Sequence, residues 1–123
     1  MADLVERQLK ESKTIAVVGL SPNADRDSNR AALYLQRVGY RVIPVNPMVE
    51  EVLGEKSYPD LKSIPADIEI DMVDVFRRSE LVEPVVDGAI EMGVKFIWMQ
   101  DGVIHDESAK KAEAAGIPVI MDN

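Results

Sequence analysis

Two patterns of hydrophobic and polar positions alternate along the chain. Short runs of apolar, mostly β-branched residues, such as residues 14–19 (TIAVVG), lack a polar–apolar alternation, which is typical of strands buried on both faces. Longer stretches between them repeat apolar residues at helical spacing, as Ala31, Leu35 and Val38 do. This exchange of patterns predicts an α/β fold, a three-layer doubly wound parallel sheet with helices on both faces.

About six strands and four or five helices are expected, in strict alternation. We place the strands at residues 14–19, 40–45, around 56, 70–76, 95–99 and 117–121. We place the helices at residues 2–12, 28–39, 79–92 and 106–115, with one helical turn at 60–63. Ser28, Ser79 and Asp106 are suited to cap the helices that they begin. Pro44 indicates a strand end or an edge strand, because proline cannot donate a ladder hydrogen bond.

Composition limits the classes of partner. The 123 residues are expected to form one domain, residues 1–123. A net charge of −8 disfavours nucleic acid and anionic membranes as partners. No apolar run approaches the roughly 20 residues that span a bilayer. The charged N-terminal segment does not resemble a signal peptide, so we expect a cytoplasmic protein.

Several kinds of chemistry are also disfavoured. The chain has no cysteine and one histidine, which excludes disulfides, thiolate catalysis and histidine-rich metal sites. We interpret His105 as a loop residue. Asp71 and Asp74 lie three positions apart on a predicted strand, so their side chains face opposite ways and a structural role is favoured over acid–base work. No nucleophile–base pair is identifiable, and we expect no intrinsic catalytic activity.

In doubly wound sheets the ligand binds beyond the C-terminal ends of the strands, where the strand order reverses. The segments at these ends are residues 19–30, 46–47, 76–79 and 99–102. The first of them has neither a G-x-G-x-x-G fingerprint nor a Walker loop. It offers instead hydroxyl and guanidinium groups that can bind a pyrophosphate in front of a helix N-terminus.

The other three segments narrow the choice of ligand. The second strand ends in Asn46-Pro47 without the acidic residue that holds the ribose of NAD. Asn46-Pro47 is suited instead to form a flat wall for an adenine ring. Arg77 and Arg78 follow the next long strand, where a guanidinium is well placed to meet a phosphate. Gln100 can bond a polar ligand group or cap its own loop.

Taken together, these segments resemble a known family. They are Gly19-x-Ser21, Arg26-Asp27-Ser28, residues 39–47 (GYRVIPVNP), residues 71–78 (D-x-VDVFRR) and Trp98-Met99-Gln100-x-Gly102. In this order and spacing the chain resembles the small stand-alone CoA-binding proteins, which are similar to the CoA-binding domain of the succinyl-CoA synthetase alpha subunit.

The resemblance implies a Rossmann-like fold that binds coenzyme A rather than NAD. It implies that the CoA phosphates lie by Gly19, Leu20, Ser21, Arg26, Ser28 and Arg30. It implies that the adenosine is flanked by Val45, Asn46 and Pro47, and that the next strand's end is lined by Val75, Phe76 and Arg77. It implies that the pantetheine arm is approached by Met99 and Gln100.

Three functions stay open at this point. The first is a non-catalytic carrier, sensor or regulatory module that holds CoA or an acyl-CoA. The second is a component of a CoA-dependent acyl transferase or ligase that acts with a partner chain. The third is an NAD(H)-binding redox sensor, which the missing glycines and the missing acidic residue disfavour. Succinyl-CoA synthetase itself has a further domain with a phosphorylated histidine, and His105 does not occupy an equivalent position.

Overall fold

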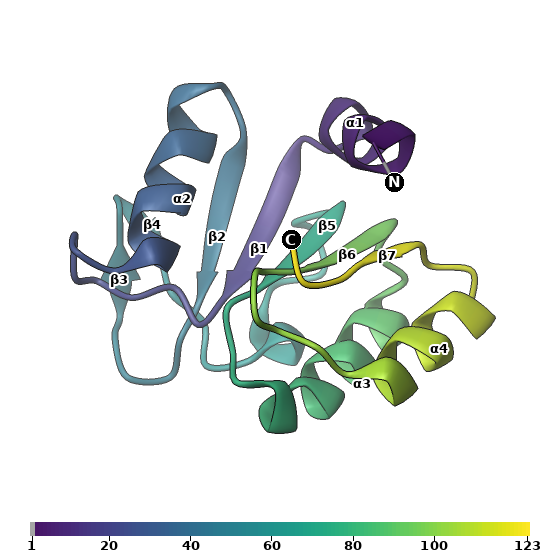
Figure 1. Cartoon of the computed structure of the whole chain (residues 1–123). Coiled ribbons are helices and arrows are strands. Elements are labelled where there is room, and N and C mark those ends of the chain that lie inside the picture. Colours follow the sequence, from purple (N-terminus) through teal and green to yellow (C-terminus); the bar gives the residue numbers. More distant parts are fainter. Residues whose placement is uncertain (1) are drawn as a thin grey trace.

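The computed structural model describes residues 2–123 and is built around a parallel sheet (Figure 1). The sheet has five strands in the order β2-β1-β5-β6-β7. Their bounds are Thr14–Val18 (β1), Arg41–Val45 (β2), Met72–Val75 (β5), Phe96–Met99 (β6) and Val119–Ile120 (β7). The strand order reverses between β1 and β5, so the structure has the switch point expected of a doubly wound sheet.

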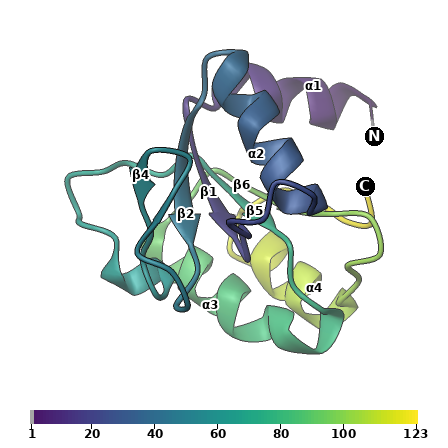
Figure 2. The same ribbon diagram turned by 90° about the vertical axis from the view of Figure 1, so that its left-hand side faces the viewer.

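Helices cover both faces of the sheet, as predicted. The helices α1 (Ala2–Glu11) and α2 (Asp27–Arg37) lie on one face, and α3 (Val82–Met92) and α4 (Asp106–Ala114) lie on the other (Figures 1 and 2). Side chains alternate between the two layers. Ile15 and Val17 of β1 pack on the α2 side, whereas Ala16 and Val18 pack on the side of α3 and α4. A strand that is buried twice has no polar face, which explains the unbroken apolar run.

The strict alternation of strands and helices is wrong between β2 and β5. The predicted strand around residue 56 exists as β4 (Glu55–Lys56), but it pairs antiparallel with β3 (Glu51–Val52) outside the main sheet. Only this hairpin and the 3₁₀ turn η1 (Leu61–Ser63) connect the two long strands. Leu53 and Gly54, both with positive φ, form the tight two-residue turn of the hairpin.

The three predicted helix caps are each displaced. Helix α2 begins one residue earlier than expected, with Arg26 at the N-cap position. A 3₁₀ turn, η2 (Ser79–Leu81), precedes α3, and the Ser79 Oγ accepts from the N–H of Ile104 at 2.9 Å instead of capping. At α4 the cap is His105, whose Nδ1 accepts from the N–H of Ser108 at 3.2 Å. Polar side chains beside a loop bond whichever backbone group lies nearest, so a serine before a helix does not by itself fix the cap.

Two residues take the structural roles expected of them. Pro44 lies in β2, which is an edge strand of the main sheet. Asp71 precedes β5 and accepts hydrogen bonds from the N–H groups of Lys13 and Thr14 at 2.8 and 3.0 Å. Its carboxylate also pairs with Lys95 at 3.3 Å. Burial alone would raise the pKa of this carboxyl, but the two hydrogen bonds and Lys95 together hold the pKa below its usual value.

Candidate functional site

The ends of three strands are tied together at the switch point. The N–H of Gly19 donates to the carbonyl of Val45 at 2.9 Å, and the N–H of Phe76 donates to the carbonyl of Val18 at 2.9 Å. Gly19 has a φ of +86°, and a Cβ at this position would lie 2.1 Å from the carbonyl oxygen of Phe76. Only glycine permits this approach, which brings the loops after β1 and β5 together.

A polar cleft of about 830 Å³ opens above this junction. Its lining comes from the loops after β1, β5 and β6 and from the first turn of α2, and it includes Ser21, Arg26, Ser28, Arg77, Arg78 and Gln100. Most of the site residues that the resemblance implies for the phosphates therefore meet in one cavity. Asp25, Asp27 and Asp101 also line the cleft, so its positive charge is local.

The loop between β1 and α2 is held open by its own side chains. The Oγ of Ser28 accepts from the N–H of Ser21 at 3.0 Å, and the Oγ of Ser21 accepts from the N–H of Asn23 at 3.1 Å. Asn29 donates to the carbonyl of Ser21 at 2.9 Å. No side chain caps the N-terminus of α2 in the described chain. The N–H groups of Arg26 and Asn29 are bonded to backbone carbonyls, which leaves those of Asp27 and Ser28, together with the positive end of the helix dipole, available to an anion.

The arginines near the cleft differ in whether they form ion pairs with carboxylates of the protein. Among residues 2–123, Arg26 and Arg77 make no ion pair, and Arg78 lies 3.8 Å from Glu80. Arg30 pairs with Asp27 on the exposed surface of α2 and does not line the cleft. Arg26 and Arg77 are thus the cleft's guanidinium groups that are best placed to meet a phosphate, and Arg30 is less well placed than the sequence suggested.

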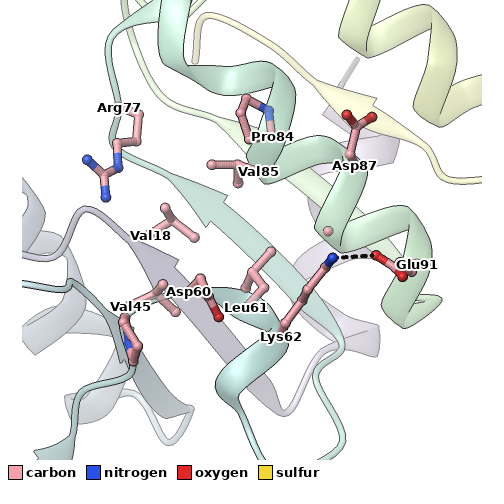
Figure 3. Close-up of a pocket in the computed structure, with 12 residues that line it drawn as sticks. Val18, Val45, Asp60, Leu61, Lys62, Arg77, Pro84, Val85, Asp87 and Glu91 are labelled. Atoms are coloured by element: carbon pink, nitrogen blue, oxygen red, sulfur yellow. Dashed lines mark ion pairs between the residues drawn. The ribbon is translucent and has the colours of Figure 1, made fainter.

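A second, apolar pocket adjoins the cleft and has a volume of about 430 Å³ (Figure 3). Its walls are formed by the ends of β1 and β2, by η1 and by α3, and they include Val18, Val45, Leu61, Pro84 and Val85. The ion pair of Lys62 with Glu91, at 3.6 Å, lies on its rim. Arg77 lines both cavities, so the apolar pocket and the polar cleft meet at its side chain.

Four of the predicted site residues do not present a free side chain. Leu20, Val75 and Met99 are fully buried and line neither the polar cleft nor the apolar pocket. The Asn46 carboxamide donates to the carbonyl of Leu20 and accepts from the N–H of Met48, both at 2.9 Å. Asn46 and Pro47 line a separate hollow beside the β3–β4 hairpin, while their neighbour Val45 lines the apolar pocket.

Sequence reasoning missed two parts of the site. Leu61 and Val85 both line the apolar pocket although they are far apart in the chain, and neither the helical turn predicted at 60–63 nor the helix predicted at 79–92 indicated a cavity. Asp74 was assigned a structural role, but its carboxyl lies buried in β5 and accepts a hydrogen bond from the Nε2 of Gln100, a residue that lines the cleft. Burial raises the pKa of Asp74 to about 7, against the opposing effect of the hydrogen bond from Gln100. The signal available in the sequence was an acidic residue, Asp74, between apolar residues in the middle of the predicted strand 70–76.

The fold and the two cavities define a doubly wound α/β domain with a cleft suited to a phosphate-bearing ligand. The family model described as a CoA binding domain matches residues 13–123. This chain therefore belongs to the family of CoA-binding domains, and the resemblance noted in the sequence is confirmed.

Relatives include both small proteins and large ligases. The chain is 42% identical over 118 residues to the uncharacterized protein YneT of Bacillus subtilis, covering 96% of this chain and 86% of that protein. A structure of a hypothetical protein from Pyrococcus horikoshii superimposes with a TM-score of 0.94 at 39% identity, covering 100% of this chain and 85% of that one. An ADP-forming acetate–CoA ligase of Archaeoglobus fulgidus is 28% identical over 109 residues, which span 87% of this chain but 16% of the ligase.

The part of the chain that the structure describes lacks both a membrane-spanning helix and a cluster of metal ligands. Within residues 2–123, no helix has the length and apolar character that crossing a membrane requires. Nor does any group of three histidine or acidic side chains in that range gather closely enough to hold a metal ion.

Proposed function

We propose that this protein binds coenzyme A or an acyl-CoA non-covalently, along the apolar pocket and the polar cleft, and serves as a non-catalytic carrier, sensor or regulatory module. The observation that carries the proposal is the position of Arg77 on both cavities. CoA likewise consists of an uncharged, flat aromatic base and a polar, phosphate-bearing chain joined at the ribose. A ligand of this shape would place its ribose and phosphates at Arg77.

The parts of the ligand can be assigned by chemistry. The adenine fits the apolar pocket, whose walls include Val45 and Val85. The phosphates fit Arg26, Arg77 and the uncapped N-terminus of α2. The pantetheine arm would then continue through the polar cleft toward residues 100–103. Asn46 takes a positioning role in this arrangement, since its carboxamide ties the loop after β2 to the loop after β1.

A non-catalytic role is supported by the state of the cleft's hydroxyl groups. The Oγ atoms of Ser21 and Ser28 both accept backbone hydrogen bonds within their own loop. His105, which would be the natural base for a serine nucleophile, accepts from the N–H of Ser108 as a helix cap. The lining groups are therefore suited to holding phosphates rather than to attacking a thioester.

The likeness to the acetate–CoA ligase favours a second candidate, a CoA-handling component that works with a partner chain. In this case the chain would supply the CoA site and the partner would supply the nucleotide chemistry. Formation of a CoA thioester in a mixture of this protein with an ATP-grasp-type subunit would favour the second candidate. A mixture that neither forms nor breaks a thioester would favour the binding module.

Calorimetric titration tests the site itself. We expect saturable heat with CoA and acetyl-CoA and none with NADH. Replacing Arg77 or Arg26 by methionine removes one charge-assisted contact with a phosphate, so each variant should lose about 10- to 100-fold in CoA affinity. Arg37→Met is the matched control, because Arg37 lies in the last turn of α2 and outside the polar cleft. Silence with both CoA and acetyl-CoA would overturn the proposal.

A further inference from the structure

The buried carboxyl of Asp74 is hydrogen-bonded to Gln100, whose carboxamide lines the polar cleft. Gln100 follows β6 and lines the cleft, and its N–H donates to the carbonyl of Val75 at 3.3 Å. Its Nε2 donates to the Oδ1 of Asp74. Asp74 is 4% exposed and lies in the middle of the sheet, across from Val17 and Trp98 in the neighbouring strands. The pair joins the interior of the sheet to the ligand cavity.

The chemistry of the pair fixes the orientation of the carboxamide. An ionised carboxylate can only accept hydrogen bonds, so Gln100 must direct its Nε2 toward Asp74 and its Oε1 away from it. Within residues 2–123 no hydrogen bond engages this Oε1. We propose that Asp74 is a positioning residue that holds the Gln100 oxygen ready to accept a hydrogen bond in the cleft, and thereby selects ligands with an amide N–H at this point.

The ligand chemistry follows from the neighbouring residues and rests on the proposed function. Residues 100–103 supply a carboxamide acceptor, the carboxylate of Asp101 and the apolar Val103, none of which favours a phosphate. The pantetheine arm of CoA is uncharged and carries two amide N–H groups. Gln100 would therefore distinguish CoA and its thioesters from nucleotides that have the same phosphates but lack the arm.

No charged residue lies across the sheet from Asp74, since its partners there are Val17 and Trp98. The helices on this face also bury polar but uncharged side chains, namely Gln8 of α1 and Ser28 and Asn29 of α2. The charged Arg7 of α1 lies over the ring of Phe96 and pairs with Glu11. Two effects act on the pKa of Asp74. Burial raises it to about 7, and the hydrogen bond from Gln100 opposes this rise. Protonation would add a donor to Asp74 and let the Gln100 carboxamide turn over.

The first experiment compares two ligands at pH 8, where phosphates are ionised. CoA and adenosine 3′,5′-bisphosphate, which lacks the arm, are titrated into the wild type, Gln100→Met and Asp74→Val. We expect the preference for CoA over the bisphosphate to fall about 5- to 10-fold in both variants, because each variant loses one hydrogen bond to the ligand. Gln36→Met is the matched control, because Gln36 donates to the carbonyl of Leu53, outside the polar cleft. It should keep the wild-type preference.

The second experiment uses Asp74→Asn, which conserves the shape of the side chain but does not titrate. The ratio of wild-type to Asp74→Asn affinity for CoA is measured from pH 8 to pH 6, so that protonation of the ligand cancels. We expect the ratio of wild-type to Asp74→Asn affinity to be above one at pH 8 and to decrease toward one as the pH is lowered and Asp74 takes up its proton. This readout holds even where Asp74→Val fails to fold.

The outcomes separate this inference from the proposed function. A wild type that binds CoA while Gln100→Met keeps its full preference, or while Asp74→Asn equals the wild type in CoA affinity at every pH including pH 8, overturns the role of Asp74 and leaves the CoA site standing. Equal affinity of the wild type for CoA and the bisphosphate does the same. A wild type that binds the bisphosphate but not CoA, or neither ligand, overturns both.

Discussion

The Cα of Gly19 lies so close to the carbonyl of Phe76 that an added Cβ would be 2.1 Å from its oxygen. This contact brings the loops after β1 and β5 together at the junction of the apolar pocket and the polar cleft. Both the positive φ and the lack of space require glycine here, and the two requirements can be separated by mutation.

Gly19→Ala should destabilise the fold and weaken CoA binding together. Gly116→Ala is the matched control, since Gly116 has the same φ of +86° with nothing within 4 Å of its would-be Cβ. The control should lose about 1 kcal/mol from backbone strain alone, and Gly19→Ala should lose at least about 2 kcal/mol more. Urea unfolding measures both. Equal losses would mean that the loop after β5 moves aside without cost.

Filling the apolar pocket should abolish CoA binding while the fold survives. Val85 is half-buried in the pocket wall, so Val85→Trp places an indole where we propose the adenine. We expect at least about a 100-fold loss of CoA affinity, since the base can no longer enter. Val38→Trp, at a position 52% exposed, controls for the added indole. Calorimetry decides between the sites: unchanged affinity in Val85→Trp would place the adenine elsewhere.

The carboxylate of Asp71 should stabilise the fold by holding the backbone at the start of β1. Asp71→Asn keeps the side-chain shape but removes the charge that strengthens the bonds from Lys13 and Thr14 and the pair with Lys95. We expect a loss of about 1–3 kcal/mol in the free energy of unfolding at pH 7. Because the folded pKa is lowered, this contribution should vanish as the pH falls below the usual aspartate range. Asp67→Asn, at an exposed position, should change little at any pH.

The sequence predicted the sheet better than the connections around it. The runs at residues 14–19 and 95–99 became β1 and β6, because a strand buried on both faces needs an unbroken apolar run. The β3–β4 hairpin gave no such signal, since its strands are two residues long and contain Glu51, Glu55 and Lys56. Its stability comes from a tight turn and from tertiary contacts rather than from its own pattern.

The site was predictable only where a general rule of the fold selects it. The strand-end rule located Ser21, Arg26 and Arg77, because the C-terminal ends of parallel strands meet at one edge. The rule gives no orientation, so it missed that Arg30 turns to Asp27. It also missed the partnership of Asp74 with Gln100, which are 26 positions apart and meet only because β5 and β6 are neighbours.

The buried Asp74 carboxyl should make the protein less stable as the pH rises from about 4 to about 7. Its pKa is raised from 3.8 to about 7 on folding, so the folded state binds the proton more tightly than the unfolded state in this range. The slope contributed by one such group is at most about 1.4 kcal/mol per pH unit, and the stabilisation is fully present only at lower pH.

Asp74→Asn does not titrate, and its stability relative to the wild type should therefore rise between pH 4 and 7 and level off above. Urea unfolding of the two proteins at intervals across this range gives the difference directly, with the other titrating groups cancelling. Parallel curves would show that the carboxyl keeps its ordinary pKa, and hence that water reaches it in the folded protein.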